Sequence, residues 1–161
     1  MTQEQRSAFS YRISQASKTQ LVEIMIEIME CNVIDGMQAY EQGEREAFRQ
    51  NMKQAKRACD ALCKSLDLNV AIAADIYVIY AYIGRQLSQA IFKKTITDME
   101  VVMKVIQILK KTFQTLSGED TTGPVMQNAQ KVYAGLTYSN GKLNELAYDI
   151  HSGNASRGYT V

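Results

Sequence analysis

Apolar residues recur at alternating steps of three and four along residues 72–91. The recurring residues are Ala73, Ile76, Tyr80, Ile83, Leu87 and Ala90. This spacing places their side chains on one face of an α-helix, so the segment predicts an amphipathic helix. Ile72, Ile79 and Tyr82 form a second row beside the first, and Tyr77 adds another aromatic ring. A helix that packs on one neighbour needs only the first row. The second row must therefore meet another helix of the chain, a symmetry mate or a partner.

Three other segments show the same helical spacing, over about residues 18–41, 44–65 and 98–116. Each is about twenty residues long, and the connections between them are short. No segment of useful length alternates with the period of two that is typical of a strand. We therefore expect an all-α fold, in which the helices form an antiparallel up-down-up-down four-helix bundle with left-handed crossings.

Local signals mark where these helices begin and end. Ser17 and, three residues later, Gln20 form a capping-box signature at the start of the first long helix. Gly43 is expected to stop that helix, since glycine is common just after a helix end. Thr97 is the expected N-cap of the last helix.

The composition changes outside the four helices. Residues 1–16 are polar except for three spaced apolar side chains and predict a flexible N-terminal arm. Residues 117–123 are rich in Gly, Ser and Thr and predict a linker, and residues 125–136 favour a short fifth helix. We expect an arm over 1–16, a bundle domain over 17–116, and a linker with a partly helical C-terminal extension over 117–161.

The charge balance argues against two classes of partner. The chain of 161 residues carries 18 Lys and Arg against 17 Asp and Glu, a formal net charge of +1, which provides no electrostatic footprint for nucleic acid or an anionic membrane. The first fifteen residues lack the apolar core of a secretory leader. The longest apolar stretch, residues 21–34, contains three glutamates and is too short for a membrane span. We expect a soluble, cytoplasmic chain with no membrane insertion.

The chain offers little for catalysis. Its one histidine, His151, lies in the C-terminal extension, whereas acid–base and metal chemistry usually require a positioned titratable group or ligand. Cys59 and Cys63 lie four residues apart on one helix, but no second pair completes a tetrahedral metal site. We interpret the three cysteines as core thiols in a reducing compartment. No phosphate-binding glycine loop is present. The sequence predicts no enzyme, no cofactor and no metal.

An acidic row lies on the helix expected over residues 18–41. It consists of Glu23, Glu27 and Glu30. Carboxylate metal sites in helical bundles also use Glu-x-x-His pairs, and no histidine falls in the four helices. We therefore interpret the row as a solvated helix face.

Three of the helices have more apolar surface than a single contact needs. The last helix carries Val101, Val105 and Ile108 beside its main seam, and the first carries two apolar rows. These rows could complete the bundle core, because diagonal contacts widen the stripe that each helix buries. A groove that accepts an amphipathic helix from another protein would also explain them.

Several short motifs occur in a defined order over residues 9–116. Near the start stand Tyr11, Ile13, Ala16, Ser17 and Leu21. Further along stand the turn at residues 41–44, the Gln-Ala-Lys segment at 54–56, the Ile-Tyr-Ala-Tyr-Ile run at 79–83, Arg85 and Leu87. Through these motifs the chain resembles the flagellin-specific export chaperones of bacteria, the FliS family. Departures at residues 26–28 and at Phe113, together with the C-terminal extension, are typical of a divergent member.

The resemblance implies a fold and a function. The family fold is an antiparallel four-helix bundle, which the periodicity predicts independently. Members bind the C-terminal segment of flagellin in the bacterial cytosol, prevent its premature polymerisation, and support its export by type III secretion for flagellum assembly. Flagellin is thus the implied partner, components of the export apparatus are further candidates, and the chain is expected to be a monomer or a weak homo-oligomer. The alternative is a homodimerising helical-bundle adaptor of another secretion or signalling system.

The resemblance also suggests which residues bind flagellin. We expect a groove formed by Ile72, Tyr77, Ile79, Tyr80, Tyr82 and Ile83, with Arg85 and Gln86 at its rim. Tyr11 and Ile13 of the arm are expected to cover this groove until flagellin displaces them. Because Tyr80, Ile83 and Leu87 also lie on the bundle seam, each could instead belong to the core.

Overall fold

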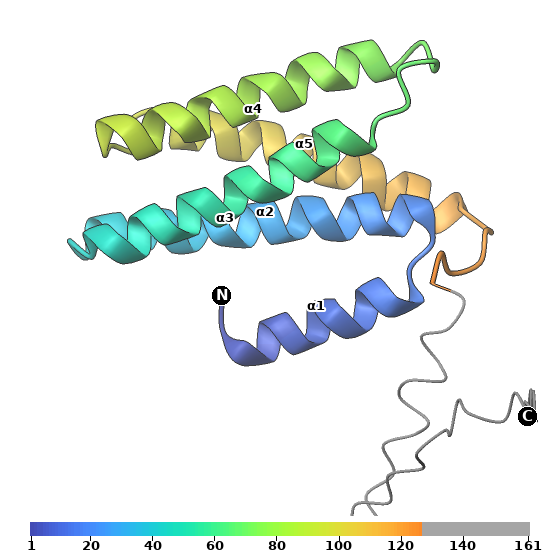
Figure 1. Cartoon of the computed structure of the whole chain (residues 1–161), viewed down its shortest axis with the longest axis horizontal. Helices are drawn as coiled ribbons and strands as arrows, with labels where there is room; N and C mark the ends of the chain where they lie inside the picture. The colour runs from blue at the N-terminus through green and yellow to red at the C-terminus, as the bar shows by residue number, and fades with distance from the viewer. Residues whose placement is uncertain (127–161) are drawn as a thin grey trace, which may run out of the picture. The chain divides into compact units, whose positions relative to one another are not determined.

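The computed structural model describes residues 1–126 and contains five α-helices and no strand in that range (Figure 1). The helices are α1 (Gln3–Gln15), α2 (Lys18–Glu41), α3 (Arg45–Ser65), α4 (Ala73–Lys93) and α5 (Met99–Glu119). The prediction of an all-α fold is confirmed.

Helices α2 to α5 form the expected antiparallel bundle, in which each helix runs opposite to the one before it (Figure 1). Helix α2 packs along α3 and α5, and α3 packs along α4, while α4 and α5 meet over a shorter stretch. The largest fully buried side chains include Tyr80, Ile26, Met29, Met52, Leu62, Ile83, Leu87, Met99 and Ile106. Burial of one such aliphatic side chain contributes about 1.5–3 kcal/mol, so this apolar core is the main force that holds α2 to α5 together.

The helix ends follow the local signals at two of three places. Ser17 accepts a hydrogen bond from the Gln20 backbone N–H, and the Gln20 side chain accepts one from the Ser17 N–H, which completes the predicted capping box. Helix α2 ends at Glu41, and Gly43 turns the chain with a φ of 75°, a conformation that favours glycine. The prediction of Thr97 as a cap is wrong: Asp98 occupies the N-cap position of α5, and Thr97 instead contacts Thr95.

The N-terminal arm is a helix in the structure, which corrects the prediction of a flexible segment. Thr2 and Gln5 form a second capping box that satisfies N–H groups at the start of α1. The helix packs on α2, where Arg12 pairs with Glu27 and the amino group of Met1 lies against Asp35. The spacing of apolar residues could not reveal this helix, because its one buried residue, Ser14, is polar.

The chain divides into two units, Met1–Ala129 and Gln130–Val161, and the second lies outside the described residues. After α5, the chain returns to the start of α2: the Val125 N–H donates to the Ala16 carbonyl oxygen at 3.0 Å. The Ser17 hydroxyl donates to Asp120 at 2.6 Å. The expected boundary near residue 117 stays a prediction, and the short helix expected over 125–136 lies almost entirely outside the described part.

Candidate functional site

Two of the expected groove residues lie inside the bundle. Tyr80 is 1% exposed and Ile83 is fully buried, and both belong to the same apolar core cluster as Leu87. Burial raises the pKa of Tyr80 to about 12, because an ionised phenolate would lose its hydration there. In this conformation Tyr80 and Ile83 support α4 from within and offer no surface to a ligand.

The other expected residues of α4 reach the surface to different degrees. Ile72, which precedes the helix, is 61% exposed, and Tyr77 is 48% exposed. Arg85 is also exposed, whereas Ile79, Tyr82 and Gln86 are half-buried. Ile79 and Tyr82 pack partly against the core cluster, so they are fixed in position while one side remains in contact with solvent.

Tyr77 and Tyr82 lie on different flanks of α4. They are five residues apart, which corresponds to about 140° around a helix of 3.6 residues per turn. Gly84 is seven residues after Tyr77, on the same side of the helix, and a Cβ atom placed on Gly84 would lie 3.6 Å from the Cys59 sulfur of α3. Tyr77 therefore lies on the flank of α4 that faces α3. The expected groove residues of α4 do not form one continuous stripe along the helix.

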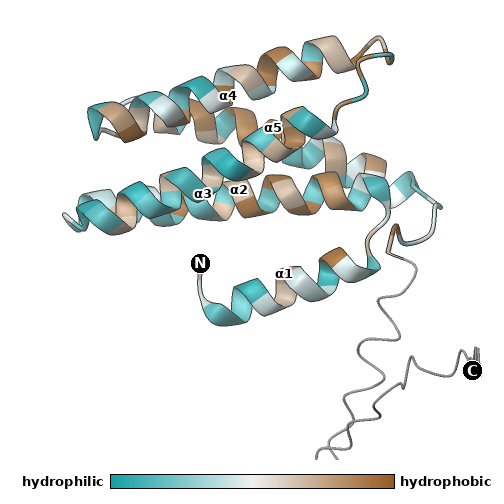
Figure 2. Cartoon of the chain, in the orientation of Figure 1, coloured by the Kyte–Doolittle hydropathy of each residue, from teal (hydrophilic) through white to brown (hydrophobic). Residues whose placement is uncertain are grey.

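Three further apolar residues extend this surface and were missed by the sequence reasoning. Val78 is 66% exposed on the outward side of α4, and Leu68 and Val70 are 70% and 51% exposed in the connection that precedes it. Figure 2 shows hydrophobic residues along α4 and in this connection. The sequence could have identified Val78 as an exposed residue, because it lies on the side of the helix opposite the core seam. We call the exposed and half-exposed set the α4 apolar surface: Leu68, Val70, Ile72, Tyr77, Val78, Ile79 and Tyr82.

The helix that contains Tyr11 and Ile13 lies on the side of the bundle away from α4 (Figure 1). Tyr11 is 61% exposed and Ile13 is half-buried. Contrary to the expectation from the sequence, the structure does not bring these two residues together with the α4 apolar surface. Helix α1 instead borders a hollow over α2 and α3 that Met25, Ile28 and Asn51 line.

Polar contacts tie α1 and α5 to α2. The Lys110 ammonium of α5 donates to Glu30 at 2.6 Å, the Ser117 hydroxyl donates to Glu23, and Arg12 of α1 forms an ion pair with Glu27. These hydrogen bonds raise the pKa values of Arg12 and Lys110 by favouring the protonated forms. The interpretation of Glu23, Glu27 and Glu30 as a solvated face is therefore wrong, because each carboxylate has a partner on another helix.

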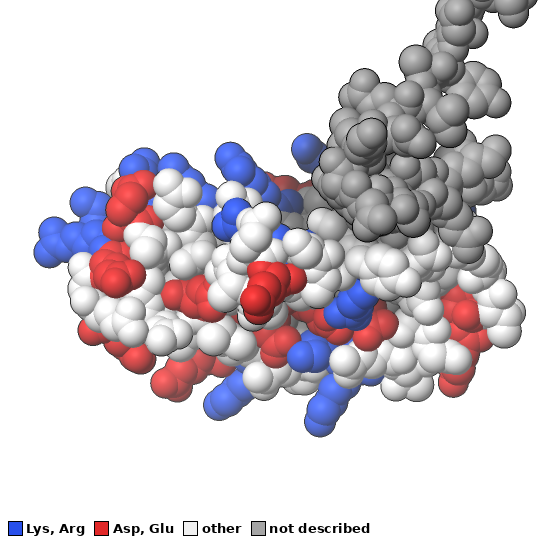
Figure 3. All heavy atoms as spheres, turned by 90° about the horizontal axis from the view of Figure 1, so that it is seen from below, with Lys and Arg blue, Asp and Glu red and all other residues white. Residues whose placement is uncertain are grey.

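Acidic and basic side chains also alternate on the surface of the protein, as expected where they form pairs. On the face seen from below in Figure 3, acidic and basic side chains lie beside one another, and neither sign covers a wide area. Glu30 is only 8% exposed, so its charge depends on Lys110 for compensation. Ion pairs therefore connect α1 and α5 to α2. The α4 apolar surface, in contrast, consists of uncharged side chains.

The described residues contain no group of three or more His, Cys, Asp or Glu side chains that could hold a metal ion. Cys59 is buried, and burial raises the pKa of its thiol to about 12, so the reactive thiolate is strongly disfavoured. Burial also raises the pKa values of Cys31 and Cys63. Among residues 1–126, no helix is long and apolar enough to cross a membrane.

A comparison with protein families gives one match. The family model described as flagellar protein FliS matches residues 1–120, which include all five helices. No curated protein matches the chain.

Proposed function

Because the chain belongs to the FliS family of flagellar proteins, we propose that it binds the C-terminal segment of flagellin and holds it for export. The family is one of flagellar export chaperones rather than enzymes. In this proposal the chain acts in the bacterial cytosol, prevents premature polymerisation of flagellin, and delivers it to the export apparatus for flagellum assembly.

The exposure of apolar side chains on a firmly packed helix supports this proposal best. Val78 and Ile72 are 66% and 61% exposed, while Tyr80 and Leu87 anchor the same helix in the core. Exposed apolar residues that gather on one element are typical of an interaction surface. Because the buried seam fixes α4, the surface can bind a partner without first being ordered.

The chemistry of this surface suits an amphipathic helix. Such a helix binds through apolar residues that recur every three or four positions, and aliphatic and tyrosine side chains provide matching contacts. Tyr77 and Tyr82 add large contact areas, and their hydroxyl groups can still reach water or a polar partner. Arg85 and Gln86 lie at the border of the surface, where they can select polar groups beside the apolar stripe.

A chaperone must also release its ligand, and α1 suits a role as a removable cover. We further propose that Tyr11 and Ile13 belong to this covering segment, although α1 packs on α2 rather than on α4. Met25 and Ile28 of α2 are half-buried next to α1 and would gain exposure if α1 moved away. The flagellin segment would then contact two sides of the bundle.

A binding experiment tests the proposed function. The full chain is co-expressed with flagellin from the same organism, with or without the flagellin C-terminal segment, and the soluble complex is isolated by size exclusion. We expect a one-to-one complex with full-length flagellin. Replacement of Val78 by aspartate is expected to weaken binding at least tenfold, because a carboxylate would be buried without a partner.

Ile108→Asp is the matched control, since Ile108 is 66% exposed on α5, as Val78 is on α4, and lies outside both the α4 apolar surface and the part of α2 next to α1. Its complex should have wild-type affinity. Absence of the complex, or equal loss with Ile108→Asp, would exclude the α4 apolar surface as the binding site. A stable dimer of the chain that binds no flagellin would favour the alternative, a homodimerising adaptor.

A further inference from the structure

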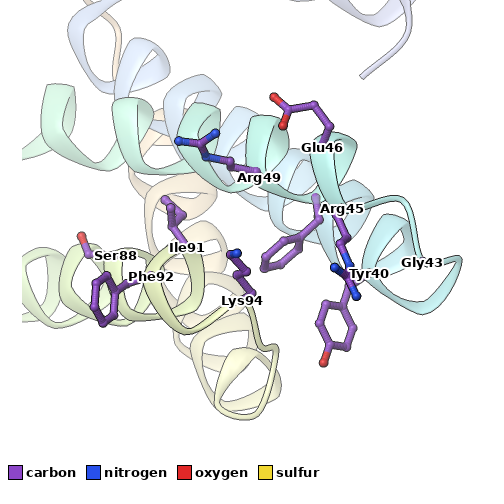
Figure 4. Close-up of a pocket in the computed structure, with 10 residues that line it drawn as sticks. Tyr40, Gly43, Arg45, Glu46, Arg49, Ser88, Ile91, Phe92 and Lys94 are labelled. Atoms are coloured by element: carbon purple, nitrogen blue, oxygen red, sulfur yellow. The ribbon is translucent and has the colours of Figure 1, made fainter.

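A cleft of about 950 Å³ lies where the α2–α3 turn meets the C-terminal end of α4 (Figure 4). Apolar side chains from three helices line it: Tyr40 of α2, Phe48 of α3 and Ile91 of α4. Tyr40 and Phe48 are in edge-to-face contact with ring centroids 5.4 Å apart, and Phe48 is only 3% exposed. The cleft therefore has a firm apolar floor.

Three cations border this floor. Arg45 and Arg49 come from the first turns of α3, and Lys94 follows α4. Figure 4 shows Arg49, Ile91 and Lys94 around the same space between α3 and α4. Within residues 1–126, none of the four ion pairs involves these three cations. The single carboxylate of the lining, Glu46, accepts a hydrogen bond from Gln50 at 3.3 Å.

Several residues of the cleft are unfavourable for the stability of the fold. Arg45 is the first residue of α3, where a positive charge opposes the helix dipole. Lys94 has a φ of 54°, in the left-handed region that favours glycine. Phe92, at the edge of the cleft, is 86% exposed, the largest exposed fraction among the large apolar side chains of the described part. Unfavourable choices that converge on one cleft indicate a binding role.

We propose that this cleft binds an acidic segment of a protein partner that carries a bulky apolar side chain between carboxylates. The apolar side chain would occupy the floor at Tyr40, Phe48 and Ile91, and the carboxylates would pair with Arg45, Arg49 and Lys94. Arginine is well suited to this role because its guanidinium binds a carboxylate through two hydrogen bonds.

This site is separate from the α4 apolar surface and goes beyond the proposed function. Val78 and Phe92 are fourteen residues apart on α4, which corresponds to about 21 Å along the helix axis. The cleft therefore lies beyond the residues that form the α4 apolar surface. The cleft provides a second contact, through which another protein can recognise the chain or its complex.

The charge distribution favours an acidic peptide over nucleic acid. Nucleic acid binding requires a basic track along which many phosphates bind, whereas here three cations surround one concave site next to the Glu46 carboxylate. The formal net charge of the chain is only +1. A short peptide with one apolar anchor matches both the size and the local charge of the cleft.

Fluorescence anisotropy tests this proposal with the full chain and a labelled peptide of sequence Gly-Asp-Glu-Phe-Glu-Asp-Gly in 0.15 M salt. We expect saturable one-to-one binding that the double variant Arg45→Glu/Arg49→Glu weakens at least tenfold. Lys53→Glu/Arg57→Glu is the matched control, because it changes the net charge by the same amount and both residues are exposed on the same helix but do not line the cleft. It should change the affinity less than twofold.

Two further measurements separate a specific site from general attraction between charges. A peptide with serine in place of Phe should bind at least tenfold more weakly, and Phe92→Ala should weaken binding of the parent peptide severalfold. Lack of peptide binding, equal losses with Lys53→Glu/Arg57→Glu, or tighter binding of an oligothymidylate than of the peptide would overturn the proposal. Circular dichroism of each variant verifies its fold, and retained flagellin binding by Arg45→Glu/Arg49→Glu would show that the two sites are distinct.

Discussion

Helices α1 and α4 both lie at the outside of the bundle, but different forces hold them there. Helix α4 buries Tyr80, Ile83 and Leu87 in the core. Helix α1 has one buried residue, Ser14, and relies on polar contacts such as the pair between Arg12 and Glu27. Burial of apolar area is little affected by salt, whereas exposed ion pairs are weak and are screened by salt. We therefore expect α1 to leave the bundle at low cost while α4 stays in place.

The solvent-exposed faces of the two helices also differ in polarity, and here α4 is the more apolar at its surface. Helix α4, which is firmly held, presents apolar residues such as Val78 to solvent, whereas the weakly held α1 presents mostly polar ones (Figure 2). A binding surface benefits from a rigid support, and a removable cover benefits from a weak attachment. The comparison thus separates a fixed contact surface from a mobile cover, and four predictions test it.

The largest expected effect comes from truncation of the α4 seam. Leu87→Ala removes a fully buried side chain and is expected to lower the free energy of unfolding by about 2–5 kcal/mol. Val78→Ala, on the outward face of the same helix, should change it by less than about 0.5 kcal/mol. Urea denaturation followed by circular dichroism measures both values. Similar losses for the two variants would show that α4 is not anchored through its seam.

Alkaline pH provides the second test of the buried side of α4. Burial raises the pKa of Tyr80 from 10.0 to about 12, so at intermediate pH the unfolded chain releases this proton while the folded chain keeps it. Stability from this residue is complete below pH 10 and is lost as the pH rises toward 12. At about 1.4 kcal/mol per pKa unit, the loss amounts to about 2–3 kcal/mol.

The variant Tyr80→Phe should reduce the fall in the free energy of unfolding between pH 10 and 12. Tyr77→Phe, on the half-exposed flank, should not. The buried thiol of Cys59, whose pKa is also raised to about 12, adds to the loss from pH 9 upward in all three proteins. Unfolding free energies measured by urea denaturation at several pH values give the profile. An equal slope in wild type and Tyr80→Phe would contradict a buried, protonated Tyr80.

The third prediction concerns the charges that tie α5 to α2. Lys110→Ala leaves the carboxylate of Glu30, which is 8% exposed, without its partner. Because Lys110 is partly exposed and water can replace some of the interaction, we expect a loss of about 1 kcal/mol. Adding Glu30→Gln should restore part of it, since the unpaired charge is removed. A double-mutant cycle by urea denaturation measures the coupling, and strict additivity would show that the pair is energetically silent.

The sequence allowed reliable prediction of the features that follow from helical periodicity. The seam that contains Tyr80 and Leu87, the capping box at Ser17 and the turn at Gly43 are all present in the structure. The docking of α1 could not be predicted, because the contact between Arg12 and Glu27 depends on how the chain folds back on itself rather than on periodicity. A short polar helix without an apolar seam looks like a flexible arm in the sequence.

The candidate site was predicted only in part, for a related reason. Periodicity identifies the face of α4 that packs inside, but it does not say how far the neighbouring helices extend over the flanks. Tyr80 therefore belongs to both the expected seam and the expected groove, and the structure shows it buried in the seam. Val78 is not among the expected groove residues although it is 66% exposed. The cleft beside Arg45 and Lys94 joins three helices at one end of the bundle, and no local pattern brings these residues together.

The smallest expected effect concerns the attachment of α1. Arg12→Ala removes the ion pair with Glu27 and should lower the free energy of local opening of residues 3–15 by about 0.5–1 kcal/mol, without a change in global stability. Hydrogen exchange of the α1 amides measures this opening, and raising the salt concentration should have a similar effect in the wild type. Arg6→Ala, an exposed change in the same helix, is the control and should leave the exchange rates nearly unchanged. If α1 opens only together with the core helices, the ion pair does not control its release, and α1 is a permanent part of the bundle rather than a cover.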